Sequence, residues 1–145
     1  EAHGMISFEN EIGKLGVSDD ILATIAGMAA VECPGVAGMA NRRLQDELAD
    51  FLGRENPGRG VEVIHKEDRL ILRLFVIIYY GTRIREAARL ITEKVTQSIQ
   101  EWVGVHVDRV EIQVDGVRFP DDLRAKQGKR TAKRPFPPPK VRFES

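Results

Sequence analysis

The clearest pattern in the chain is the alternation of side chains between Leu70 and Tyr80. Successive side chains of a β-strand point to opposite faces, so an alternation of this length predicts one long strand. One face of this strand is apolar throughout, with Leu70, Leu72, Leu74, Val76 and Ile78. The other face is half apolar, and such a face needs a cover, which suggests a partner. The predicted association face consists of Ile71, Phe75, Ile77 and Tyr79, bordered by Arg69 and Arg73.

Helical periodicity marks three segments. Ser18–Val31 begins with a good capping residue and ends before Pro34-Gly35, and its apolar stripe is Ile21, Leu22, Ile25, Met28 and Ala29. Asn41–Leu52 carries Leu44, Leu48, Phe51 and Leu52 on one face. The longest segment, Thr82–Val103, ends at Gly104 and has its stripe at spacings of three and four: Ile84, Ala87, Ala88, Ile91, Val95, Ile99 and Trp102.

Shorter alternations predict the remaining strands. A short edge strand is expected at Ile12–Val17, and Val61–Ile64 is expected to turn at Lys66–Asp68 into the long strand. A last strand follows the long helix, with Val110, Ile112 and Val114 on one face. The order of elements favours an α/β fold: a small two-layer sandwich, with a three- to four-stranded sheet and helices packed mainly on one face. The expected core includes Ile25, Leu72, Leu74, Val76, Ile91, Val95 and Trp102.

Composition divides the chain into three parts. We expect an N-terminal arm at 1–11, partly of arbitrary sequence, an α/β domain at 12–119, and a mobile, basic, proline-rich tail at 120–145. Net charge is zero, but the segment from Arg118 onward carries nine basic and three acidic residues, so the body is acidic. Such a basic segment suits anionic lipid, nucleic acid or the acidic domain of the same protein.

Catalytic and metal-binding patterns are missing from the sequence. The histidines His3, His65 and His106 have no neighbours at metal-ligand spacing, and nothing nominates a base for Cys33. We therefore expect no enzymatic activity, no cofactor, no metal and no small-molecule substrate. A lone cysteine fits the reducing cytoplasm, and no segment reaches the roughly 18 apolar residues of a membrane helix.

One local motif supports a different class of function. Gly35-Val36-Ala37-Gly38 lies between two predicted helices and is followed by Arg42 and Arg43. This order resembles the KH arrangement, in which a GxxG loop clamps a nucleic-acid backbone. The middle positions, Val36 and Ala37, offer no polar group to a phosphate. An RNA-binding module that uses Gly35, Gly38, Arg42, Arg43 and the basic tail is thus the alternative hypothesis.

Taken in order, five short segments between Gly13 and Phe119 give the chain a family resemblance. They are Pro34–Met39, Gly60–Val63, Tyr80–Ile84, Val103–Val105 and Val110–Val117. Together they are similar to the alkaline shock proteins of Gram-positive and related bacteria, also called envelope stress response or Gls-type general stress proteins. Trp102-Val103 departs from a Met-Thr pair that is frequent in the family, and the basic tail is an addition.

The resemblance implies a function without catalysis. It implies a stress response protein that stays in the cytoplasm, associates with itself, and is held near the membrane by a separate anchor protein. It assigns no catalytic, cofactor or metal-binding residues, in agreement with the residues themselves. Two hypotheses remain open at this point: an interaction protein that works through its sheet, and the RNA-binding module.

Overall fold

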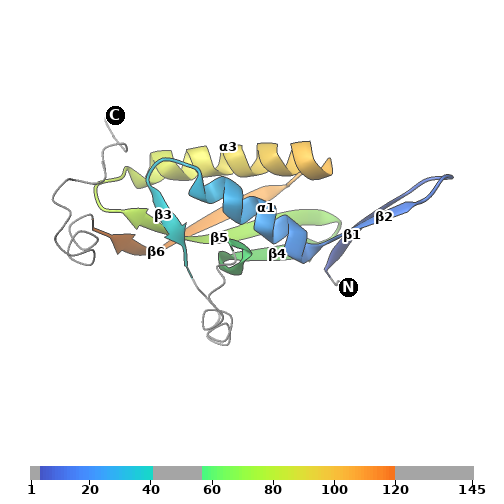
Figure 1. Ribbon diagram of the computed structural model, residues 1–145, viewed down its shortest axis with the longest axis horizontal. Coiled ribbons are helices and arrows are strands. Elements are labelled where there is room, and N and C mark those ends of the chain that lie inside the picture. Colours follow the sequence, from blue (N-terminus) through green and yellow to red (C-terminus); the bar gives the residue numbers. More distant parts are fainter. Residues whose placement is uncertain (1–3, 41–56, 120–145) are drawn as a thin grey trace, which may run out of the picture.

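The computed structural model describes residues 4–40 and 57–119 of the chain. Its strands are β1 (Met5–Glu9), β2 (Lys14–Ser18), β3 (Val36–Met39), β4 (Val61–Lys66), β5 (Arg69–Tyr79) and β6 (Arg109–Arg118). Its helices are α1 (Asp19–Val31), α3 (Ile84–Val103) and a short 3₁₀ segment, η2 (Pro57–Gly60). Both long helices lie on the same side of a four-stranded sheet (Figure 1). The predicted α/β class is therefore confirmed.

Strand β5 is the centre of the four-stranded sheet. Strand β6 runs parallel along one edge of β5, from the pair Ile71–Arg109 to the pair Tyr79–Arg118. The other edge is shared by two antiparallel strands, β4 along residues 69–74 and β3 along residues 76–78. Because β5 and β6 are parallel, the connection between them must cross over the sheet, and α3 makes this crossover. The long alternating segment of the sequence thus forms the strand that pairs with the other three strands of this sheet.

The main core lies between the sheet and the helices. The inward side chains of β5 pack there against α1 and α3. The largest fully buried side chains of this core, taken from the strand and both helices, are Leu22, Leu72, Leu74, Val76, Ile78, Ile91, Val95 and Ile99. In α3 the buried residues recur at every fourth position, as expected for one stripe of a helix. In α1 most of them are small, namely Ala23, Ala26, Ala29 and Ala30, which lets this helix approach its neighbours closely.

Trp102 is a correction to the predicted core, because its side chain is 76% exposed. Ile84, at the other end of α3, is also exposed. Both lie on the predicted stripe, but they occupy the terminal turns of the helix, beyond its buried positions Ala87 to Ile99. The stripe predicted for α1 is wrong in part for a different reason. Ile21 and Met28 are exposed, because the buried side of α1 is its alanine-rich side.

The predicted edge strand forms in a different place. Residues 14–18 do form a strand, β2, but it pairs with β1 in a separate two-stranded sheet, from Met5–Ser18 to Glu9–Lys14. This hairpin projects from the body of the domain at the start of α1 (Figure 1). At its base, Ile6 and Val17 pack against the main core. The helix predicted at residues 41–52 and the tail predicted at 120–145 lie outside the described residues.

Local chemistry explains several element ends. Gly104 ends α3 in the left-handed conformation, with φ of 81°, as glycine after a helix commonly does. Glu67 and Asp68 join β4 to β5 with φ of 50° and 68°, the backbone that a two-residue hairpin turn requires. Ser18 occupies the predicted cap position of α1, but its side chain makes no capping hydrogen bond. None of the helices in the described part is long and apolar enough to span a membrane.

The buried position of Ile91 leads to the first prediction. Replacing Ile91 by alanine leaves a cavity between α3 and the sheet, so the free energy of unfolding should fall by about 2–5 kcal/mol. The control is Trp102→Ala on the same helix, which should change stability by less than about 1 kcal/mol because Trp102 is exposed. Urea denaturation of both variants measures the difference. Equal losses would show that the packing of α3 is described wrongly.

Gly35 leads to the second prediction. Its φ is +93°, and a β-carbon added there would lie 2.6 Å from Cγ2 of Thr82. Gly35→Ala should therefore cost about 1–3 kcal/mol in the free energy of unfolding. Gly38 is the matched control, because a β-carbon there meets nothing within 4 Å. An equal thermal midpoint for Gly35→Ala and Gly38→Ala would contradict the described turn.

Candidate functional site

The candidate site is the face of the four-stranded sheet that points away from α1 and α3 (Figure 1). Directly paired residues of neighbouring strands place their side chains on the same face, so the register identifies the members. Row by row from β4 through β5 to β6, they are Lys66–Arg69, Ile64–Ile71–Arg109, Glu62–Arg73–Glu111, Phe75–Gln113, Ile77–Gly116 and Tyr79–Arg118. We call this surface the outer face.

A row of alternating charges crosses the outer face. Arg73 on β5 donates from Nε to Oε1 of Glu111 on β6 at 2.9 Å, and from Nη1 to Oε1 of Glu62 on β4 at 3.2 Å. The second carboxylate oxygen of Glu111 lies 3.1 Å from Nε of Arg109. The hydrogen bond to Glu111 is the main cause that raises the pKa of Arg73 above its ordinary value. The row joins all three strands by side-chain contacts as well as by backbone hydrogen bonds.

This charged row divides the apolar residues into two groups. The first is the cross-strand pair Ile64 and Ile71, and the second is Phe75, Ile77 and Tyr79. Arg73 was expected at the border of the association face, but it lies between the two groups. Its position follows from the strand alternation, because it is halfway along the outer face of β5. A partner must therefore match two apolar areas and the charges between them.

The predicted association residues differ in exposure. Ile71, Ile77 and Tyr79 are partly buried. Phe75 is only 4% exposed, although it lies on the outer face and is not part of the core cluster beneath the helices. Phe75 therefore leaves little exposed surface for a partner. A charge at a buried position would test folding rather than association.

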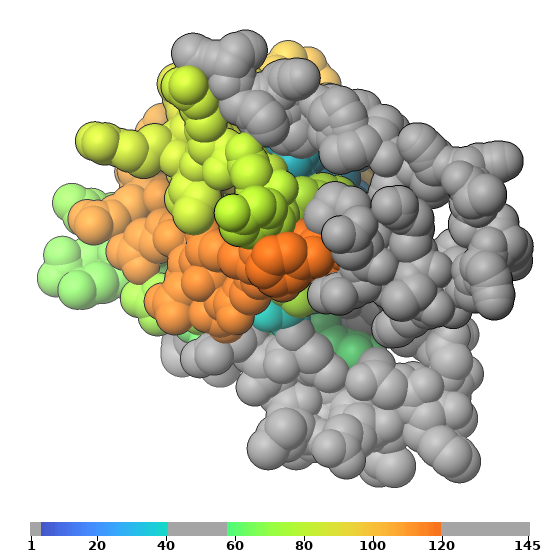
Figure 2. All heavy atoms as spheres, turned by 90° about the vertical axis from the view of Figure 1, so that its left-hand side faces the viewer, coloured from blue at the N-terminus to red at the C-terminus, as the bar shows by residue number. Residues whose placement is uncertain are grey.

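An aromatic contact closes one end of this sheet. The backbone N–H of Tyr80 donates to the carbonyl oxygen of Arg118 at 2.9 Å, which extends the pairing of β5 and β6. The rings of Tyr80 and Phe119 stack there with their centroids 4.9 Å apart. Figure 2 shows this end of the molecule, where β6 in orange lies beside the turn that leads into α3 in yellow-green. Both residues are exposed.

The glycine motif is built differently from a KH loop. Residues 36–39 are not a loop between helices but the strand β3, paired with β5. Gly35 accepts a hydrogen bond from the N–H of Tyr79 at 2.9 Å, and Gly38 lies opposite Ile77 in the sheet. These backbone groups are thus paired within the protein, and the loop expected at residues 35–38 is corrected to a strand that begins at Val36. Arg42 and Arg43 lie outside the described residues.

Reactive side chains do not gather into a site in the described part of the chain. Cys33 is buried, its Sγ donates to the carbonyl oxygen of Ala29 at 3.6 Å, and burial raises the pKa of its thiol. His65 Nε2 lies 2.8 Å from Oδ1 of Asp19, which ties β4 to the start of α1. Within residues 4–40 and 57–119, no three His, Cys, Asp or Glu side chains are grouped so that they could hold a metal ion.

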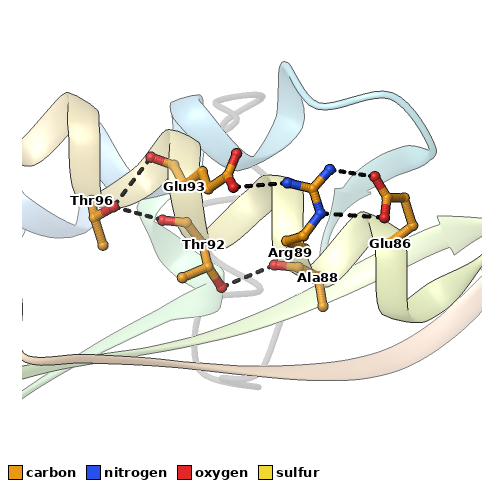
Figure 3. A network of polar contacts seen from close by, with 6 residues as sticks. All are labelled: Glu86, Ala88, Arg89, Thr92, Glu93 and Thr96. Carbon is orange, nitrogen blue, oxygen red and sulfur yellow. Dashed lines mark hydrogen bonds and ion pairs between the residues drawn. The ribbon is translucent and has the colours of Figure 1, made fainter.

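One polar network lies along a single helix, α3. Arg89 contacts Glu86 and Glu93 on successive turns of α3, while Thr92 and Thr96 donate to backbone carbonyls of the same helix (Figure 3). The hydrogen bond to Arg89 lowers the pKa of Glu86, and the bond to Glu86 raises the pKa of Arg89. The three charged groups are exposed on one helix, whereas the two threonines are partly buried. The network stabilises the helix rather than forming a site.

The sequence interpretation missed Glu62, Ile64 and Glu111 on the outer face. A two-residue turn at Glu67 and Asp68 fixes the register of the hairpin, and this register places Glu62 opposite Arg73. The length of this turn was therefore a signal in the sequence, because adding or removing one turn residue would shift the pairing of β4 with β5. The pairing of Glu111 with Arg73 had no such signal, because the crossover through α3 does not set a register.

Comparisons with known proteins identify relatives of this chain. The profile of the alkaline shock protein 23 family, described as having a "cell envelope-related function", matches residues 7–119. The uncharacterized protein YloU of Bacillus subtilis (strain 168) is 36% identical over 114 residues, which are 78% of this chain and 95% of that protein. The uncharacterized protein Spy1614 of Streptococcus pyogenes serotype M6 is 28% identical over 114 residues, 78% of this chain and 94% of that protein.

A third relative is similar at a greater distance. The uncharacterized protein YqhY of Bacillus subtilis (strain 168) is 25% identical over 119 residues, 82% of this chain and 86% of that protein. No solved structure matches the chain significantly. The family match spans nearly all of the described domain, and it confirms the resemblance to alkaline shock-type proteins. The chain therefore belongs to the alkaline shock protein 23 family, whose function is related to the cell envelope.

Proposed function

We propose that this protein acts in the envelope stress response without catalysis, by associating with itself and by binding a membrane-anchored protein. The family supports the relation to the envelope. The single observation that carries the proposal is the outer face, which has two apolar areas and no helix on it among the described residues. A two-layer domain with one helical layer leaves such a face for a partner.

The composition of the outer face suits an interface. Interfaces between proteins combine an apolar centre with polar groups that fix orientation. On the outer face, Ile64 and Ile71 form one apolar area, while Ile77 and Tyr79 belong to the other. The charges between them are already paired within the chain, so covering them does not bury an isolated charge. The row also gives a partner a pattern of donors and acceptors to match.

Ile71 is the position that best tests the proposal. It is partly buried, and Arg109 lies opposite it on β6, so a carboxylate at position 71 has a cation beside it. Ile71→Glu should therefore stay folded. A charge in the centre of an apolar contact opposes association, so the apparent dissociation constant should rise at least about tenfold. Sedimentation velocity over a range of concentrations measures this change, with circular dichroism as the check on folding.

The matched control is Gln100→Glu, which makes the same change of charge on an exposed position of α3. This variant should associate as the parent does. A parent chain that stays monomeric at high concentration would contradict the self-association. An Ile71→Glu variant that associates as tightly as Gln100→Glu would contradict the role of the outer face.

A further inference from the structure

The strand at the side of the sheet, β6, offers a contact that the outer face does not include. In the described part of the chain, β6 pairs with β5 along one edge and with no second strand. The backbone groups on its other edge are those that pair with another strand in an extended sheet. Its ten residues make it nearly as long as β5. An open edge of this length is a template for one more strand.

The side chains of β6 show the same incompleteness. Val110, Ile112 and Val114 pack against the core on the side of the helices, yet all three are partly buried rather than buried. The corresponding residues of β5, such as Leu72 and Leu74, are completely buried. The core thus thins out at β6, and a further strand beside β6 would cover these apolar side chains.

We propose that a second copy of the chain supplies this strand, so that two β6 strands pair antiparallel and join two four-stranded sheets into one. This inference rests on the proposed self-association and adds a second contact to the one on the outer face. A two-fold axis perpendicular to the sheet relates the two copies, which keeps both helix layers on the same side. Because such an interface is isologous, the sequence of β6 must complement itself.

The two faces of the sheet restrict the register of this pairing. Directly paired residues share a face, so Val110, Ile112 and Val114 must meet residues from the same row of the other copy. The two-fold axis then passes through a residue opposite its own copy. The bulge at Asp115 reverses the faces of the side chains beyond it, so only residues 109–115 can pair with the faces matched. Within this stretch, three registers pair five or more of the seven residues: those centred on Glu111, on Ile112 and on Gln113. Moving the centre from one of these residues to the next gives every charged side chain a different partner.

Charge selects one of the three registers. Centring on Glu111 places two Glu111 carboxylates opposite each other, and centring on Gln113 places Glu111 opposite Asp115. Centring on Ile112 instead pairs Arg109 with Asp115 twice and Val110 with Val114 twice, with Ile112 against Ile112. Opposite charges across a strand pair are favourable and like charges are unfavourable. The geometry therefore points to Ile112 as the centre.

The local backbone agrees with this choice. The pairing of β5 with β6 shifts between Val76–Val114 and Ile77–Gly116, so that Asp115 is the extra residue of a bulge. The regular part of the strand before the bulge is Arg109–Val114. In the chosen register Val110–Val114 pair with one another, and Arg109 meets Asp115 at the bulge itself. Nε2 of Gln113 donates to Oδ1 of Asp115 at 3.1 Å, which fits a position of Asp115 on the outer face with Arg109.

Single cysteines test the register directly. In a Cys33→Ala background, the variants Glu111→Cys, Ile112→Cys and Gln113→Cys each carry one thiol. In an antiparallel pair, only the residue on the two-fold axis meets its own copy at a distance that a disulfide can span. Under mild oxidation, Ile112→Cys should give a covalent dimer on a non-reducing gel, and the other two should give at most traces.

The outcomes separate this inference from the proposed function. A covalent dimer that forms best at position 111 or 113 would overturn the register. A parent that dimerises in solution while no position cross-links would overturn the β6 contact and leave the outer face as the interface. A monomeric parent would overturn both.

A charge exchange gives an independent test. Arg109→Asp and Asp115→Arg should each weaken dimerisation about tenfold, because each replaces two attractive pairs by two repulsive ones. The double variant restores both pairs in reversed order, so it should dimerise as the parent does. Arg85→Asp, on the exposed surface of α3, is the matched control for the change of charge. Failure of the double variant to recover would contradict the pairing of Arg109 with Asp115.

Discussion

The rest of the structure depends on the burial of β5 between its neighbours. This strand has paired backbone on both edges, its inward side chains make the core with α1 and α3, and its outward side chains carry the centre of the outer face. Strands β3 and β4 share one of its edges, and the meeting point is tight. A β-carbon at Gly60 would lie 2.7 Å from the carbonyl oxygen of Ala40. Glycine is needed there because two strand ends and β5 converge.

The two sides of this sheet are stabilised by different interactions. On the helical side, large aliphatic side chains are completely buried, and each contributes about 1.5–3 kcal/mol by its removal from water. On the outer face, Arg73 and its two carboxylates are partly exposed, so their ion pairs contribute much less to stability. Their effect is mainly on specificity. A partner that buries the outer face must accommodate a charge row in a fixed position between two apolar areas.

The sequence predicted the elements whose patterns are long and local. The alternation in β5 and the fourfold spacing in α3 both gave the correct element, and Gly104 gave the correct helix end. The errors arose where tertiary packing decides. Trp102 has the right position around α3 but lies in the terminal turn, and Ile21 is exposed because the alanine side of α1 is the buried one. The charge row joins three strands. Its contact with Glu111 on β6 could not be predicted, because the crossover through α3 does not fix how β6 is aligned with β5.

The candidate site shows the same division. The alternation alone placed Ile71, Ile77 and Tyr79 on one face, but the burial of Phe75 and the central place of Arg73 required the structure. The glycine motif at residues 35–38 was misinterpreted because a short strand and a short loop have similar sequences, and the pairing with β5 decides between them. Association through the sheet is our proposal for the outer face and for the edge of β6 that pairs with no second strand among the described residues.

Amide hydrogen exchange of the unmodified protein at low and high concentration tests this account most directly. If the protein associates through its sheet, amide exchange should slow as the protein concentration rises. The slower exchange should appear in peptides from β6 and from the strands that form the outer face. Peptides from α3 should keep the same rate, because that helix lies on the opposite side. Slowing confined to the helices, or rates that are equal at every concentration, would contradict it.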